Sequence, residues 1–62
     1  MADVHYHRMM APLKFDQAVS QRRLAHFEFR IGRPNMARAE LRRAIRAWQS
    51  FRYHKQAAEK LQ

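Results

Sequence analysis

Three arginines with a regular spacing are the residues of this sequence whose chemistry is easiest to interpret. Arg38, Arg42 and Arg46 recur every four residues, so on a helix they stack along one side. A guanidinium donates hydrogen bonds from a planar fork that matches phosphate and carboxylate oxygens. Tyr53 and Lys60 extend the same side, and an exposed tyrosine ring can stack on an unpaired base. The spacing therefore predicts an anion-binding face formed by Arg38, Arg42, Arg46, Tyr53 and Lys60.

The charge of the whole chain agrees with such a face. The 62 residues include 13 Lys and Arg against 5 Asp and Glu, a formal net charge of +8, and ten of the 13 are arginine. This excess causes self-repulsion in a compact protein, so a polyanionic or acidic partner is its simplest explanation. We expect that partner to be nucleic acid or a nucleoprotein complex, bound through phosphates without sequence-specific reading. DNA and RNA remain equal candidates.

The residue types needed for catalysis or metal binding are not grouped in the sequence. There is no cysteine, a single glycine cannot form a glycine-rich phosphate loop, and the acids are scattered. His5 and His7 form a His-x-His pair, but two imidazoles are too few for a closed metal site. His26 and His54 lie at no ligand-like spacing from that pair. We therefore expect a non-enzymatic binding protein or regulator with no metal, no cofactor and no small-molecule substrate.

The sequence also lacks the signals of a membrane or secreted protein. No apolar run approaches the roughly 20 residues that span a bilayer. The first residues are polar, without the apolar core of a secretory signal. The sequence has no cysteine, so nothing in it points to an oxidising compartment. We expect a cytoplasmic protein that does not enter a membrane.

The anion-binding face needs a helix to carry it, and the sequence predicts two. Gly32 can end a helix in the left-handed conformation, Pro34 stops its continuation, and Asn35 is suited to cap the next helix. Pro12 or Asp16 is suited to begin the first one. A connection this short makes the two helices antiparallel neighbours. The prediction is an all-α hairpin forming one domain, residues 1–62, with an arm (1–11), a first helix (12–31), a turn (32–35) and a second helix (36–61).

Large apolar side chains indicate where the two helices would pack together. In the second helix one stripe recurs at helical spacing: Ala37, Leu41, Ala44, Trp48 and Phe51. We expect the core between the helices to contain Leu24, Phe27, Leu41, Ala44, Ile45 and Trp48.

The first helix carries apolar residues on two faces, which is one face more than a hairpin needs. Phe15 and Val19 lie on one face, and Leu24 and Phe27 lie on the opposite one. The second face predicts a further partner, either the N-terminal arm folding back or another copy of the chain. We expect a homodimer that forms a four-helix bundle, with the arm as the alternative cover.

The turn and its flanks resemble a single tetratricopeptide repeat over residues 18–51. The matching positions are the family's leucine and small residue, inter-helix glycine, packing alanine, large apolar residue and second alanine, here Leu24, Ala25, Gly32, Ala37, Leu41 and Ala44. Gln21 and Glu28 stand where the family has aromatic residues, and no proline closes the motif. The resemblance implies a protein-binding hairpin without catalytic residues. On this alternative the chain is an adaptor or inhibitor whose arginines meet an acidic protein surface.

Overall fold

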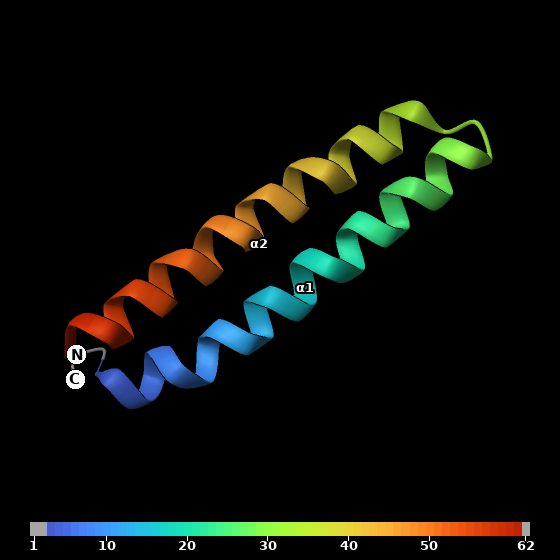
Figure 1. The fold of residues 1–62 in the computed structure, drawn as a ribbon. Coiled ribbons are helices and arrows are strands. Elements are labelled where there is room, and N and C mark those ends of the chain that lie inside the picture. The colour runs from blue at the N-terminus through green and yellow to red at the C-terminus, as the bar shows by residue number, and fades with distance from the viewer. Residues whose placement is uncertain (1–2, 62) are drawn as a thin grey trace.

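The computed structural model describes residues 3–61 and consists of two long antiparallel helices (Figure 1). α1 spans Val4–Arg30, α2 spans Pro34–Leu61, and a tight turn joins them. Together they form a rod of 46 × 15 × 13 Å, in which the start of α1 lies beside the end of α2. The described residues contain no strand. The predicted all-α antiparallel hairpin is confirmed.

α1 begins earlier than the sequence predicted. Asp3 caps it, because the Oδ1 of its side chain accepts a hydrogen bond from the backbone N–H of Tyr6 at 2.9 Å. Residues 4–11, expected to form an arm, are the first turns of α1, and Pro12 lies inside the helix rather than at its start. A proline there removes one backbone hydrogen bond. Packing of these first turns along the second half of α2 offsets that loss, so the expected arm does not fold back as a separate cover.

The turn ends α1 as the sequence predicted, but α2 begins at a different residue from the one expected. Gly32 has a φ of 79°, and the N–H of Arg33 donates to the carbonyl of Glu28 at 2.8 Å, which closes α1 in a Schellman arrangement. α2 then begins at Pro34, with the carbonyl of Arg33 accepting its first hydrogen bond at 3.0 Å. Proline suits this position because its φ is already helical and its missing N–H would have no partner there. Asn35, expected as the cap, lies in the first turn of α2 instead.

Within residues 3–61, the buried residues of each helix lie on one line, and we call these two facing lines the seam. Along both lines the steps alternate between three and four residues, which is the heptad spacing of a coiled coil. The seam of α1 comprises His7, Ala11, Lys14, Ala18, Gln21, Ala25 and Glu28, and that of α2 comprises Ala37, Glu40, Ala44, Ala47, Phe51, His54 and Ala58.

The seam consists mainly of alanines and polar side chains, which alternate along α1, and Phe51 is its only large apolar member. Ala25 and Ala37 are completely buried. Small side chains let two helix backbones approach closely, so at the levels of these alanines there is no space between the helices for a leucine or an aromatic ring. Among the described residues no large side chain is completely buried.

The expected core is therefore mostly wrong. Ala44 is buried and Leu41 is half-buried, but Leu24, Phe27, Ile45 and Trp48 are exposed. These four side chains lie on either side of the seam or behind it, because the alanines occupy the positions that face the other helix. The prediction selected large apolar residues at helical spacing, whereas the helices pack through small ones.

A pair of neighbouring substitutions distinguishes the two descriptions of the core. Ala25→Leu should destabilise the hairpin by about 1–3 kcal/mol, because it forces a larger side chain between closely packed helices. Leu24→Ala should cost about 1 kcal/mol or less, because Leu24 is 42% exposed. Urea unfolding followed by circular dichroism measures both changes. A larger loss for Leu24→Ala than for Ala25→Leu would contradict the alanine seam.

Candidate functional site

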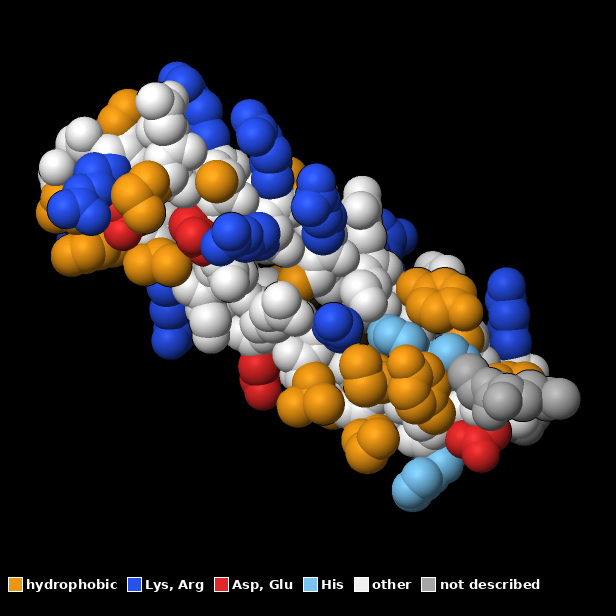
Figure 2. All heavy atoms as spheres, turned by 180° about the vertical axis from the view of Figure 1, so that it is seen from behind, with side chains coloured by type: hydrophobic (Ala, Val, Ile, Leu, Met, Phe, Trp, Pro, Cys, Tyr) orange, Lys and Arg blue, Asp and Glu red, His pale blue; other side chains and the backbone are white. Residues whose placement is uncertain are grey.

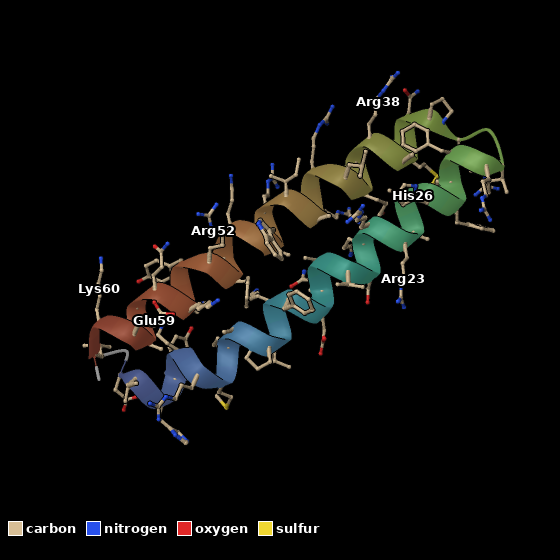
Figure 3. All side chains as sticks on the ribbon, viewed as in Figure 1. Arg23, His26, Arg38, Arg52, Glu59 and Lys60 are labelled. Atoms are coloured by element: carbon tan, nitrogen blue, oxygen red, sulfur yellow. The ribbon has the colours of Figure 1, made fainter. Side chains whose placement is uncertain are left out.

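The five residues predicted to bind anions all lie exposed on α2, and we call them the basic face: Arg38, Arg42, Arg46, Tyr53 and Lys60. Figure 3 shows Arg38 and Lys60 pointing away from α1, near opposite ends of the helix. At 1.5 Å per residue, the face extends over about 33 Å, and its three arginines rise by about 6 Å from one to the next.

Arg52, which the sequence prediction did not include, also points away from α1 in Figure 3. Seen from the opposite side, a row of basic side chains projects along the edge that α2 forms (Figure 2). Arg52 therefore adds positive charge to α2 between the three arginines and Lys60.

None of the arginines of the basic face is neutralised within the described residues. The two ion pairs found among residues 3–61 join Arg33 to Glu28 at 4.0 Å and Arg43 to Glu40 at 3.1 Å. Both acids belong to the seam and are nearly buried. The guanidinium groups of the basic face thus keep their hydrogen-bond donors available for a ligand.

The distribution of acids makes the exterior more basic than the net charge suggests. Two of the five acids, Glu28 and Glu40, are buried in the seam, which leaves Asp3, Asp16 and Glu59 exposed. Every arginine is exposed, and among the lysines only Lys14 is half-buried. A ligand that approaches α2 from outside therefore meets many more exposed basic side chains than acidic ones.

At the end opposite the turn, the structure joins two histidines that the sequence did not connect. The Nδ1 atoms of His7 and His54 lie 2.7 Å apart, and the two side chains are only 4% and 6% exposed. One ring must donate and the other accept, so the pair holds one proton between these two atoms. Tyr6 and Tyr53 contact the pair edge-on, with Tyr6 5.5 Å and Tyr53 5.2 Å from His54 between ring centroids. Histidine and hydrophobic side chains gather at this end in Figure 2.

The environment of the pair favours the neutral form of His54. Burial lowers the pKa of His54 below its ordinary value of 6.5, and the nearby His7 and Lys14 lower it further. No signal in the local sequence predicts this contact, because the two histidines are far apart in the chain and meet only through the register of the hairpin. Within residues 3–61 no three potential metal ligands come together.

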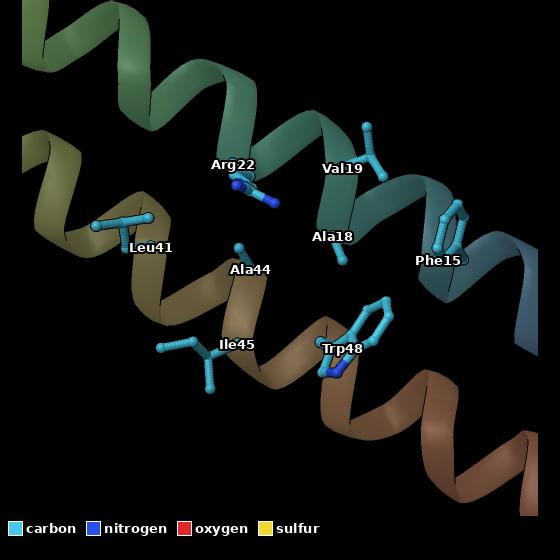
Figure 4. Close-up of a pocket in the computed structure, with 8 residues that line it drawn as sticks. All are labelled: Phe15, Ala18, Val19, Arg22, Leu41, Ala44, Ile45 and Trp48. Atoms are coloured by element: carbon cyan, nitrogen blue, oxygen red, sulfur yellow. The ribbon is translucent and has the colours of Figure 1, made fainter.

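A groove beside the seam is the second feature that the sequence reasoning missed. It lies between the two helices and has a volume of about 470 Å³ (Figure 4). We call it the apolar groove, and its lining residues are Phe15, Ala18, Val19, Arg22, Leu41, Ala44, Ile45 and Trp48. The sequence showed that apolar side chains exceed what a hairpin needs. It did not show that residues from both helices line one depression.

Comparison of the chain with protein-family models, with curated proteins and with solved structures finds no match. Neither helix has a stretch in its described residues that is apolar enough, over sufficient length, to cross a membrane. The geometry of the chain itself therefore carries the functional argument.

The histidine pair gives a pH-dependent stability that can be measured. Because the pKa of His54 is lowered by folding, the unfolded chain binds more protons than the folded chain between that lowered pKa and 6.5. The unfolding free energy should therefore be highest above pH 6.5 and should fall as the pH drops below 6.5. Thermal melts between about pH 5 and pH 8 measure this dependence.

Substitutions at two histidines test whether the pair causes the dependence. His54→Gln should flatten the melting-temperature profile in this range, whereas His26→Gln, at an exposed position of α1, should leave it unchanged. An equal loss of pH dependence in both variants would contradict a specific role for the pair.

Proposed function

We propose that this chain is a small, non-enzymatic protein that binds nucleic acid through the basic face of α2. The observation that supports this most strongly is the distribution of charge: two of the five acids are buried in the seam, while the arginines of the basic face are exposed and have no ion-pair partner within residues 3–61. Phosphate oxygens accept the paired hydrogen bonds that a guanidinium donates. The three arginines on successive turns of α2 span about 12 Å, and the basic face as a whole lies along a phosphate backbone over about 33 Å.

Binding of this kind is sequence-independent and salt-sensitive. Each phosphate contact releases condensed counterions, so affinity falls as salt concentration rises. Arginine can also hydrogen-bond to guanine, but three arginines repeated every four residues present the same donor at each step, which suits the repeating phosphates. The proposed ligand is therefore the sugar–phosphate backbone, shared by DNA and RNA, with Tyr53 as a stacking surface for an unpaired base.

The alternative proposal is that this chain is an adaptor or inhibitor and that the basic face binds an acidic surface of another protein. The same arginines would then pair with carboxylates at a protein interface. Nuclease treatment before a pull-down separates the two, because a protein complex survives it and a nucleic-acid-mediated association does not.

The salt dependence of oligonucleotide binding tests the proposal. Replacing Arg38, Arg42 and Arg46 together with Gln should flatten the slope of log affinity against log salt by about two to three units, because three phosphate contacts are lost. Gln also forms helices well, so the helicity should hardly change. Fluorescence anisotropy with labelled duplex and single-stranded oligonucleotides provides the measurement.

A second triple variant controls for total charge. Replacing Arg8, Arg23 and Arg30 on α1 with Gln removes the same charge from exposed positions outside the basic face. This control should keep most of the wild-type slope. Equal effects of the two triple variants, or no binding by the wild type at about 50 mM salt, would contradict the proposed interface.

Single strands and duplexes should respond differently to the loss of Tyr53. Stacking on an aromatic side chain contributes about 1–3 kcal/mol per base in single-strand complexes. Tyr53→Leu should therefore weaken binding of single strands by roughly tenfold and leave duplex binding almost unchanged. The side chain is 62% exposed, so the ring has room for a base. Equal losses with both ligands would show that Tyr53 acts only through the fold.

A further inference from the structure

The apolar groove lies at the surface beside the seam, and large apolar side chains along it stay exposed. Ala18 and Ala44, two members of the seam, form its floor. Phe15 and Trp48 face each other at one end with ring centroids 5.9 Å apart, and they stay 41% and 44% exposed. In Figure 4, Ala18 and Arg22 from one helix and Ala44 and Trp48 from the other lie in the space between the helices, with Val19 and Ile45 at its outer edges. Large aromatic side chains around a small-residue floor are typical of the pockets that anchor interfaces.

The wall of the groove is held in place by an aromatic cluster. Phe51 lies 5.4 Å from Phe15 and 5.2 Å from Trp48 between ring centroids. Lys55 lies beyond this cluster, with its Nζ 6.0 Å from the centre of the Phe51 ring. A partner would therefore meet a wall that is already assembled, with positive charge past its end.

Arg22 is the only charged residue that lines the groove. In Figure 4 its side chain lies between the two helices, above Ala44. Within residues 3–61 it has no ion-pair partner. A molecule that fills the groove covers this guanidinium. Unless that molecule supplies a hydrogen-bond acceptor, the charge of Arg22 is buried without a partner, which weakens binding.

This requirement argues against a second copy of the chain as the occupant. A symmetric dimer brings the same patch of both copies together. Two apolar grooves facing each other would bring in Arg22 twice and no acid, since no lining residue is acidic. The homodimer expected from the sequence would therefore have to bury like charges without a partner.

We propose that the apolar groove binds an amphipathic helix of another protein, whose apolar stripe contacts Phe15 and Trp48 and whose flanking carboxylate pairs with Arg22. A helix suits this site because the groove runs lengthwise between α1 and α2. The side-chain ridges of a third helix can pack into such a groove. An acidic flank matches Arg22 within the groove and Lys55 beyond its end. The site lies beside the seam, whereas the basic face points outward, so this inference does not rest on the proposed function.

Two designed peptides of about 20 residues test the proposal, a length chosen because much shorter helices are marginal in water. Both carry the same leucine stripe and no tryptophan, one with glutamate flanks and the other with lysine flanks. Trp48 is the only tryptophan of the chain, so its fluorescence reports filling of the groove. The glutamate peptide should shift the emission to shorter wavelength and bind at least about tenfold tighter than the lysine peptide. Failure to bind, or equal binding of both peptides, would overturn the proposal.

Charge reversal at two neighbouring arginines locates the contact. Arg22→Glu should reverse the preference so that the lysine peptide binds more tightly, and the milder Arg22→Gln should abolish the preference. Arg23→Glu makes the same change of charge at a side chain that points away from α2 in Figure 3, so it should keep the preference. Equal effects at the two positions would show that total charge, and not the groove, selects the peptide.

Two further measurements separate this site from the alternatives. The Arg38, Arg42 and Arg46 triple Gln variant should bind the glutamate peptide as tightly as the wild type does, because the basic face lies outside the groove. Weaker binding by this variant would show that the peptide contacts the basic face and would overturn the proposal.

Sedimentation equilibrium of the chain alone should give a monomer at micromolar concentration. A dimer that Ile45→Asp disperses would assign the groove to a second copy instead.

Discussion

The close approach of two helices through alanine is the constraint on which the rest of this structure depends. At the levels of Ala18, Ala25, Ala37 and Ala44, the space between the helices is too narrow for large side chains. Leucines and aromatic residues therefore lie along the edges of the seam, where a hairpin alone cannot cover them. The exposed groove is thus a consequence of how the helices pack.

The tight turn determines how the helices align, and the polar members of the seam fit that register. His7 meets His54 at the far end, and the same register places Gln21 level with Glu40. Buried carboxylates cost desolvation, so Glu28 and Glu40 add little net stability. They also withdraw negative charge from the surface, which leaves the outside of α2 to its arginines.

Part of this structure could be predicted from the sequence because its signals are local. Gly32 and Pro34 determine the turn, and the four-residue spacing of Arg38, Arg42 and Arg46 predicted side chains that share a face, which the structure leaves exposed. The similarity to a tetratricopeptide repeat stays a prediction, although its three alanine positions are buried here.

The core was predicted wrongly because hydrophobic size was given more weight than spacing. Ala11, Ala18 and Ala25 are seven residues apart, a heptad signal that the sequence contains and that large residues on other faces obscured. The histidine pair and the groove were beyond reach, since each depends on the register between residues far apart in the chain. Asp3 as the cap of α1 was overlooked because Pro12 gave a stronger local signal for a helix start.

The alanine seam can be observed directly by nuclear magnetic resonance with selectively methyl-labelled alanine. The account predicts nuclear Overhauser contacts between alanine methyl groups of α1, such as Ala18 and Ala25, and those of α2, such as Ala37 and Ala44. A spectrum without contacts between the alanine methyl groups of the two helices would contradict it.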